Sequence, residues 1–177
     1  MQKKIASRND AAPVGRPVLD LDRHVPYFFT HISNRLSRGA SETYRKHFGL
    51  GITEWRVMGV LAGIPNITAN QVINAIGLDK GAVSRSLGVL EKNRLVKSEP
   101  DPRDKRSRLM RLSPAGEALH DRVIVAALAR EERLLSPLSP EEVEGLIVCL
   151  RKMRAVISYV NAYDVEEPPT RSGRKKA

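Results

Sequence analysis

Cationic side chains that could bind a polyanion are concentrated in one part of the chain, residues 80–111. The 177-residue chain has a formal net charge of +10, and this segment holds ten cations against four anions, a local net charge of +6. Such a concentration is typical of nucleic-acid binding, because cations that neutralise phosphates release counterions. A run of charges can also be an ordinary solvated face. The secondary structure that carries these cations must therefore distinguish nucleic-acid binding from a solvated surface. The cations are Lys80, Arg85, Lys92, Arg94, Lys97, Arg103, Lys105, Arg106, Arg108 and Arg111.

The first half of this segment is predicted to belong to a helix-turn-helix. Thr68 and Gln71 have the spacing of a capping box, in which both side chains bind free backbone N–H groups at the start of a helix. Gly77 ends this short helix, and Asp79 is a suitable N-cap for the next one, expected over residues 80–93. Two short helices joined by a tight turn that contains glycine are typical of this motif.

The second of these helices has two contrasting faces. Val83, Leu87 and Leu90 share one face and are predicted to lie in the core. A small, cationic face suits a helix that enters a groove about 12 Å wide. Two interior glycines cost about 1 kcal/mol each relative to alanine, and a solvated face would gain nothing from them, whereas close approach of a partner would. The residues on this opposite face are Gly81, Ser84, Arg85 and Gly88.

The second half of the segment is predicted to form a β-hairpin, or wing. Residues 95–99 and 108–112 are two short extended runs. The residues between them, 100–107, are rich in turn formers and cations and cannot continue a helix. The hairpin would therefore have a long, basic tip.

Helices are predicted on both sides of this lobe. Apolar residues recur at three- and four-residue steps from about residue 22 to 48, and Thr53 is the expected N-cap of a second helix. A fifth helix is expected to begin at Ser113 and Pro114, and a sixth to follow the capping box at Ser139 and end near residue 163. The first and sixth helices carry apolar stripes over about six turns or more, more than one lobe can cover, which predicts dimerisation.

The joined pattern resembles the MarR family of bacterial winged-helix transcription regulators. The resemblance implies a mainly α fold with a small β-hairpin wing, in which a winged helix-turn-helix lobe is joined to a helical dimerisation arm. The expected divisions are a flexible basic arm at 1–21, a MarR-type domain at 22–163 with its DNA-binding core at about 53–112, and a disordered tail at 164–177. The residues that carry the match are Asn70-Gln-Val-Ile, Gly77-Leu-Asp-Lys-Gly-Ala-Val-Ser-Arg, Leu90-Glu-Lys-Asn-Arg-Leu-Val, Asp101-Pro-Arg-Asp-Lys-Arg and Leu112-Ser-Pro-Ala-Gly.

The resemblance implies a homodimer whose first, fifth and sixth helices interlock. Its two recognition helices would lie about 34 Å apart and read a pseudo-palindromic operator in double-stranded DNA. On each helix, Ser84 and Arg85 would reach base edges, Lys80 would meet phosphate, and Gly81 would allow close approach.

The wing has two expected roles under the same resemblance. Arg106, with Lys105 beside it, matches the cation that enters the minor groove. Asp101 and Arg103 match a pair that bonds within the wing and stiffens it, with Pro102 between them as a departure from the family pattern.

A sensor pocket is a further expectation. Six of the eight aromatic residues lie between positions 27 and 55. Tyr27, His31 and Arg35 follow one another at four-residue steps on one helix face and could hold an aromatic carboxylate. The resemblance implies an effector between the first and second helices, which adds Trp55 and Met58, and effectors that are aromatic acids or their coenzyme A thioesters. The alternative is that the aromatics fill the core or dimer interface while His31 and Arg35 are merely exposed.

Other chemistry is not indicated. The four histidines lack metal-ligand spacing, and no phosphate loop, nucleophile elbow or paired-carboxylate signature is present, so we predict neither an enzyme nor a metal or cofactor site. Cys149, the single cysteine, excludes an internal disulfide and a multi-cysteine zinc site, and between two apolar residues it is expected to be buried and inert. No apolar run reaches the roughly 18–20 residues that span a bilayer, and the start lacks a secretory pattern, so a cytoplasmic protein is expected.

Two functions are therefore open at this stage. One is a repressor that is released from its operator by a small aromatic acid or its thioester. The other is an architectural or nucleoid DNA-binding protein with little sequence preference and no ligand. A repressor should prefer its operator over random DNA by about 10³ or more, and an architectural protein should not.

Overall fold

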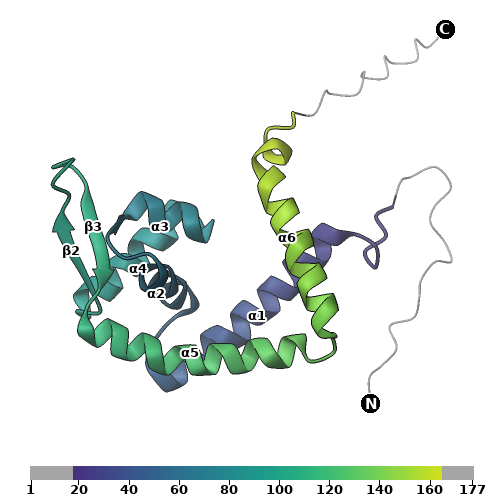
Figure 1. The fold of residues 1–177 in the computed structure, drawn as a ribbon, viewed down its shortest axis with the longest axis horizontal. Helices are drawn as coiled ribbons and strands as arrows, with labels where there is room; N and C mark the ends of the chain where they lie inside the picture. The colour runs from purple at the N-terminus through teal and green to yellow at the C-terminus, as the bar shows by residue number, and fades with distance from the viewer. Residues whose placement is uncertain (1–17, 165–177) are drawn as a thin grey trace, which may run out of the picture. The chain divides into compact units, whose positions relative to one another are not determined.

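The computed structural model describes residues 18–164 and divides the chain into two compact units, with the boundary between Ile124 and Val125. The predicted arm at 1–21 and tail at 164–177 therefore lie almost entirely outside the described residues. The elements, shown in Figure 1, are α1 (Val25–Phe48), α2 (Ile52–Gly63), β1 (Ile67–Thr68), α3 (Ala69–Ile76), α4 (Lys80–Lys92), β2 (Val96–Pro100), β3 (Arg108–Leu112), α5 (Pro114–Leu135) and α6 (Pro140–Asn161).

The first unit has its core where α2, α3 and α4 pack beside the β2–β3 hairpin (Figure 1). The predicted inner face of α4 is confirmed, because Val83, Leu87 and Leu90 are all buried. Further buried side chains of this core come from α2, α3 and α5. Burying each aliphatic side chain contributes about 1.5–3 kcal/mol to stability. They are Val57, Met58, Leu61, Val72 and Val123.

The predicted capping box at the start of α3 is confirmed. The backbone N–H of Gln71 donates to the Thr68 hydroxyl at 3.3 Å, and the backbone N–H of Thr68 donates to Gln71 Oε1 at 2.8 Å. Gly77 ends α3 in the left-handed conformation, with φ +71°, which a glycine adopts without steric cost. Asp79 then caps α4 by accepting the backbone N–H of Ala82 at 2.9 Å. The helix-turn-helix is therefore set by local side-chain bonds.

The predicted hairpin is also confirmed, and it belongs to a larger sheet. Strands β2 and β3 pair antiparallel from Val96 opposite Leu112 to Pro100 opposite Arg108. The two-residue strand β1 adds to the other side of β3, so the strand order is β1-β3-β2. The third strand was not predicted, because two residues are too short to show the period-two pattern of a strand.

The expected N-cap of α2 was wrong. Gly51 holds the N-cap position in an extended conformation, and its carbonyl accepts the backbone N–H of Trp55 at 3.1 Å. The first turn therefore starts at Ile52 and includes Thr53.

The start of α5 agrees with the sequence. The Ser113 hydroxyl accepts the backbone N–H of Gly116 at 3.0 Å and donates to the Arg94 carbonyl at 2.7 Å. A side chain at Gly116 would collide with the backbone of Leu95, so glycine is required where α5 crosses the chain that leads into β2.

The second unit contains the end of α5 and the helix α6. The predicted capping box at Ser139 is confirmed, with the Glu142 N–H donating to the serine hydroxyl at 3.3 Å, and α6 ends at Asn161. No residue of α6 is buried, so the expectation that Cys149 is buried was wrong for the single chain: its apolar neighbours are uncovered and the thiol is exposed. Within the part of the chain that the structure describes, no helix has the length and apolar character needed to cross a membrane.

Candidate nucleic-acid interface

The outer face of α4 presents the residues predicted to read DNA. Lys80, Gly81, Ser84 and Arg85 are exposed, and Gly88 continues the same face one turn further on. Neither Gly59 in α2 nor Gly88 has an atom within 4 Å of the position that a Cβ would occupy. Packing within the first unit therefore does not explain why Gly88 is a glycine.

A residue that the sequence did not point to bonds this helix to its neighbour. Ser86 is buried on α4, and its hydroxyl donates to Glu54 Oε1 on α2 at 2.8 Å. The bond joins the buried side of α4 to α2. A lone serine in an amphipathic pattern is no signal for such a bond, because its partner lies 32 positions away in the sequence.

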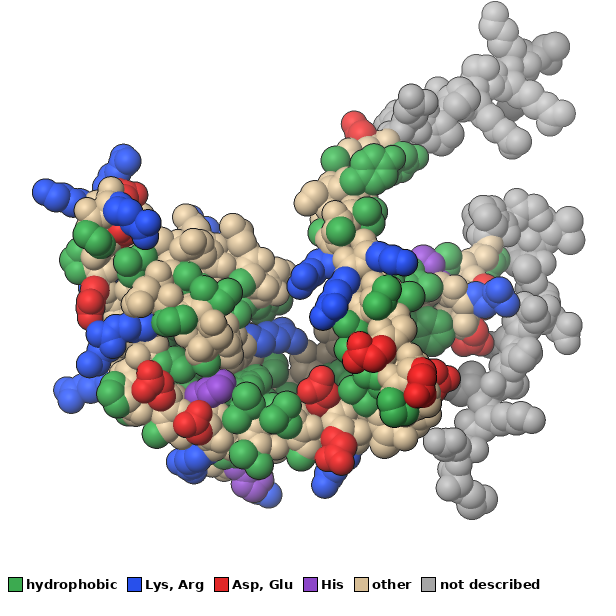
Figure 2. All heavy atoms as spheres, viewed as in Figure 1, with side chains coloured by type: hydrophobic (Ala, Val, Ile, Leu, Met, Phe, Trp, Pro, Cys, Tyr) green, Lys and Arg blue, Asp and Glu red, His purple; other side chains and the backbone are tan. Residues whose placement is uncertain are grey.

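The wing places a second group of cations at the far end of the hairpin. Figure 2 shows Lys and Arg side chains gathered at the tip of the β2–β3 hairpin. Arg103, Lys105 and Arg106 lie in this tip and are exposed, and the Arg106 side chain is 95% exposed. These side chains are accessible to a polyanion from solution.

Two of the cations on the strands, Arg108 and Arg111, are engaged within the hairpin. The guanidinium of Arg108 donates to the Ser98 hydroxyl at 2.9 Å and to the Ser98 carbonyl at 2.6 Å. Arg111 pairs with Glu99 across the two strands at 2.8 Å. Within the wing, Arg108 and Arg111 therefore brace the two strands, whereas the tip cations project from the hairpin.

Asp101 and Arg103 lie in contact at the base of the tip. Asp101 Oδ1 accepts the backbone N–H of Arg103 at 2.9 Å, and the Arg103 Nε lies 3.7 Å from the same oxygen. The Asp101 side chain is only 12% exposed, and its backbone N–H donates to the Ser107 carbonyl at 2.9 Å. These bonds close the tip onto the strands.

Asp104 organises the end of the tip and was not singled out from the sequence. Its Oδ1 accepts the backbone N–H of Arg106 at 3.0 Å, and its Oδ2 accepts the Ser107 hydroxyl at 2.9 Å. The Arg106 backbone N–H, the Ser107 hydroxyl and the Arg106 guanidinium hold the pKa of this exposed carboxyl below its ordinary value. The sequence did offer a signal for this bond. An aspartate inside a predicted turn often accepts the backbone N–H two residues further on, which is an Asx turn.

The five residues predicted to bind an effector fall into separate groups. Tyr27 and His31 have ring centroids 5.5 Å apart on α1, and Arg35 is exposed one turn further on. Trp55 lies instead with Tyr44, at 5.9 Å, and stacks on His120 of α5 at 5.3 Å. Met58 is 0% exposed in the core and has no surface for a ligand in this conformation.

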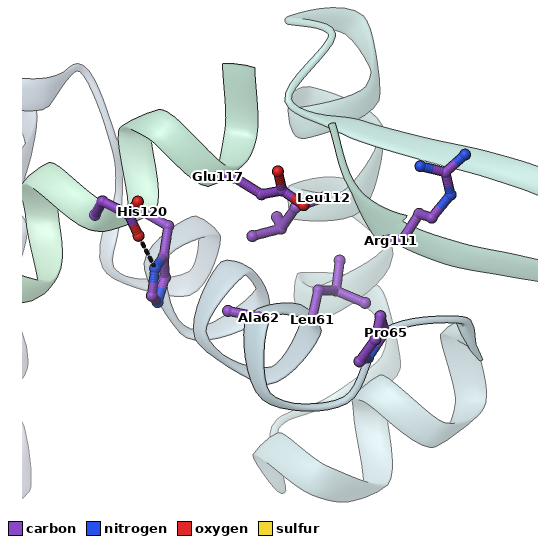
Figure 3. Close-up of a pocket in the computed structure, with 8 residues that line it drawn as sticks. Leu61, Ala62, Pro65, Arg111, Leu112, Glu117 and His120 are labelled. Carbon is purple, nitrogen blue, oxygen red and sulfur yellow. Dashed lines mark hydrogen bonds and ion pairs between the residues drawn. The ribbon is translucent and has the colours of Figure 1, made fainter. Parts of the chain in front are cut away.

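A hollow of about 450 Å³ lies in the first unit between the end of α2, the end of β3 and the start of α5. Figure 3 shows Leu61, Ala62 and Pro65 on one side of it and Leu112 and Glu117 on the other. His120 lines the hollow, and its ring also stacks on Trp55, which lies beside Tyr44. The Nδ1 atom of His120 lies 3.3 Å from Asp121 Oδ1, and Asp121 lines the hollow as well. Sequence spacing did not indicate this hollow, since its walls come from three separate segments.

Among residues 18–164, no group of three or more His, Cys, Asp or Glu side chains is arranged to hold a metal ion. The features above, a capped helix-turn-helix with an outward cationic face and a basic wing beside it, define a winged helix-turn-helix DNA-binding protein.

Comparison with known proteins gives the family. A family model described as the MarR family matches residues 48–107. The uncharacterized HTH-type transcriptional regulator YkoM of Bacillus subtilis is 33% identical over 107 residues, 60% of this chain and 70% of that protein. The transcriptional regulator HosA of Escherichia coli O111:H- is 33% identical over 100 residues, 56% of this chain and 74% of that protein.

A solved structure agrees over most of the chain. The MarR/EmrR family transcriptional regulator from Acinetobacter sp. ADP1 superposes with a TM-score of 0.74 and 30% identity, covering 80% of this chain and 99% of that one. The chain belongs to the MarR family. It is a DNA-binding transcription regulator, and the family is not one of enzymes.

Proposed function

We propose that the protein is a homodimeric, sequence-specific repressor that binds a pseudo-palindromic operator and is released by a small aromatic carboxylate or its coenzyme A thioester. The DNA-binding part of this proposal rests on the outer face of α4. Its cations and small residues are exposed together, while the opposite face is core. A helix of this kind inserts into the major groove with its N-terminal residues toward base edges.

The roles of the individual residues follow from their places. Ser84 and Arg85 read bases, Lys80 binds phosphate at the start of α4, and Gly81 lets the DNA backbone come close. The tip cations Lys105 and Arg106 enter the minor groove, where the narrow walls favour a cation.

The tip can take that role because it is stiffened from within. Asp101 and Arg103 hold its base through the bonds described above.

In this proposal the DNA-binding core is the part from about residue 53 to 112, within a regulator domain at 22–163.

Dimerisation is supported by apolar side chains that each unit leaves uncovered. On α1, Val25, Phe28, Phe29 and Ile32 are exposed. On α6, Val156, Ile157 and Val160 are exposed as well. Apolar groups of this number on long helices are typical of an interface, and a second copy of the chain is the occupant we propose. The dimer acts where the operator DNA is, in the cytoplasm.

The effector is proposed to lie against α1 and α2. Tyr27, His31 and Arg35 offer an aromatic ring, an imidazole and a guanidinium on one exposed face, which suits an aromatic carboxylate. Trp55 would contribute its ring from α2, whereas Met58 would need the core to repack before it could take part.

The DNA-binding half is tested by measuring affinity for an operator selected from random duplexes against affinity for unselected duplexes. We expect a preference of about 10³ or more at fixed salt, with one dimer per site. A preference near unity would support the architectural alternative, in which the basic wing binds DNA with little sequence preference. A monomer at micromolar concentration would contradict the dimer.

The effector half is tested by the thermal melt of the dimer with benzoates, hydroxycinnamates, their coenzyme A thioesters and unrelated acids. A ligand at a hundred times its Kd should add about 2.7 kcal/mol to the free energy of unfolding. Stabilisation by an aromatic acid that is lost in Arg35→Ala, with release of the operator, is the expected result. A flat panel would contradict an aromatic acid or thioester effector.

A further inference from the structure

We propose that the hollow between the end of α2, the end of β3 and the start of α5 binds a small organic cation, a primary amine that carries an apolar group. None of the five proposed effector residues lines this hollow. The inference goes beyond the proposed function, because it uses no residue of α1, no second copy of the chain and no DNA.

The hollow has the size and the walls of a small-molecule site. Its volume is about 450 Å³, within the range of about 300–1,000 Å³ that is typical of such sites. Leu61, Ala62 and Pro65 at the end of α2 form one apolar wall, and Leu112 of β3 lies across from them (Figure 3). All the lining residues belong to the first unit, so the site needs nothing from the second.

The charges at the hollow favour a cation, although the chain as a whole has a net charge of +10. The Arg111 guanidinium is bound to Glu99 at 2.8 Å, and Figure 3 shows it directed away from Glu117. Glu117 and Asp121 add two carboxylates one turn apart on α5. Within residues 18–164, no ion pair involves Glu117. An ammonium group at this edge of the hollow would therefore be attracted, and an anion would be repelled.

His120 gives the hollow an aromatic end. Its side chain is 14% exposed, its ring centroid lies 5.3 Å from that of Trp55, and its Nδ1 lies 3.3 Å from Asp121 Oδ1. Asp121 is therefore shared with the imidazole, which leaves Glu117 as the main partner of an ammonium group. Because Trp55 is the single tryptophan of the chain, its fluorescence reports on a ligand that contacts His120.

The test measures binding of phenethylamine to the purified full-length protein by calorimetry and by the emission of Trp55. We expect a Kd of about 1 mM or lower, as for other small ligands with one charged group and one ring. No binding up to about 10 mM would overturn the inference. Binding that leaves the Trp55 emission unchanged would place the amine elsewhere and would overturn it too.

Two probes with the same ring and spacer test the charge of the ligand. 2-Phenylethanol lacks the ammonium group and should bind about threefold more weakly or worse, because the charge-assisted bond to Glu117 is lost. 3-Phenylpropionate carries the opposite charge and should not bind at this hollow. If either probe binds as tightly as the amine, and loses affinity in Glu117→Gln to the same extent, the site does not select a cation.

Three variants test the location. Glu117→Gln should weaken phenethylamine binding about three- to tenfold, because it removes the charge but keeps the size of the side chain. Ala62→Phe should abolish binding, because it places a ring in the hollow. Glu131→Gln is the matched control: Glu131 is exposed further along α5 and does not line the hollow, so the affinity should not change. Equal losses in Glu117→Gln and Glu131→Gln would overturn the inference.

Folding defects do not confuse this test. Glu117 is exposed, so the thermal melt of unliganded Glu117→Gln should match that of the wild type. If Ala62→Phe does not fold, the comparison of Glu117→Gln with Glu131→Gln still decides the location.

The outcomes for this inference and for the proposed function are distinct. Arg35→Ala should leave phenethylamine binding unchanged, whereas any binding of 3-phenylpropionate to the proposed effector site should depend on Arg35 and not on Glu117. Loss of the amine in Arg35→Ala, with normal binding in Glu117→Gln, would place it on α1 and would overturn this inference. Failure of the operator or aromatic-acid predictions would leave the hollow's selectivity for an amine untouched, since neither enters this experiment.

Discussion

The Ser86 hydroxyl on α4 donates to Glu54 Oε1 on α2 at 2.8 Å, from the one polar residue among the buried residues of α4. The bond ties α4, the proposed recognition helix, to α2, which carries Trp55, one of the proposed effector residues. Two serines two positions apart on α4 thus have different roles, since Ser84 faces outward and Ser86 inward.

Ser86→Ala should lower the free energy of unfolding by about 1 kcal/mol, because it removes one partner of a largely buried hydrogen bond. Ser84→Ala, two positions away and exposed, should change it by less than about 0.5 kcal/mol. Chemical denaturation of the two variants at one protein concentration checks the difference. Equal effects would show that the bond to Glu54 contributes nothing to stability.

Arg85→Ala should relax sequence preference. A bidentate arginine–guanine contact accounts for about 1–3 kcal/mol of discrimination, so operator affinity should fall by that amount while affinity for random duplexes changes less. Lys80→Ala is the matched control: a phosphate contact should weaken both duplexes alike and lower the salt slope by about 1. Equal loss on both duplexes in Arg85→Ala would contradict the base-reading role.

Gly88→Ala should stabilise the protein and weaken DNA binding. Alanine is favoured over glycine by about 0.5–1 kcal/mol in a helix interior, and the added Cβ meets no atom within 4 Å in the free chain. A partner that approaches the outer face closely would be obstructed by the same methyl group.

Gly59→Ala on α2 is the control for this prediction, because its Cβ is equally unobstructed and it lies outside the proposed interface. It should gain the same stability with unchanged operator affinity. If Gly88→Ala also binds DNA normally, the glycine does not serve a close approach.

The carboxyl of Asp104 should titrate below its ordinary value of 3.8, because the Arg106 N–H, the Ser107 hydroxyl and the Arg106 guanidinium favour its charged form. A depressed pKa contributes stability that is present above the unfolded value and is lost as pH falls through the folded value. The order of the wing tip should therefore persist to pH 3.8 and be lost only below it. Carbon-detected NMR titration of the Asp104 carboxyl checks this, and a midpoint at or above 3.8 would contradict it.

Local signals explain most of the predicted architecture. The capping boxes at Thr68 and Ser139, the caps at Asp79 and Ser113, and the two faces of α4 all depend on residues within a few positions of one another. Such signals act through backbone N–H groups and helical periodicity, so they can be recognised in the sequence. The wrong N-cap at Thr53 is also a local error, because the N-cap of α2 is Gly51, two residues earlier.

The effector residues show where sequence reasoning stops. Periodicity placed Tyr27, His31 and Arg35 on one face of α1, and the structure agrees that Tyr27 and His31 are neighbours. Periodicity could not reveal that Met58 is fully buried or that Trp55 stacks on His120, because both depend on how α2 packs against other helices.

The sequence by itself determined the order of the six helices, the helix-turn-helix, the basic hairpin and the side of α4 that faces outward. Those features follow from backbone capping and from apolar periods that neighbouring residues define. The tertiary structure decided which cations are engaged between the strands and which project from the tip of the hairpin. It placed Arg108 and Arg111 against Ser98 and Glu99, and it left Arg106 projecting from a turn that Asp104 holds. Hydrogen bonds and ion pairs across strands depend on register and side-chain direction, which are defined only when the chain is folded.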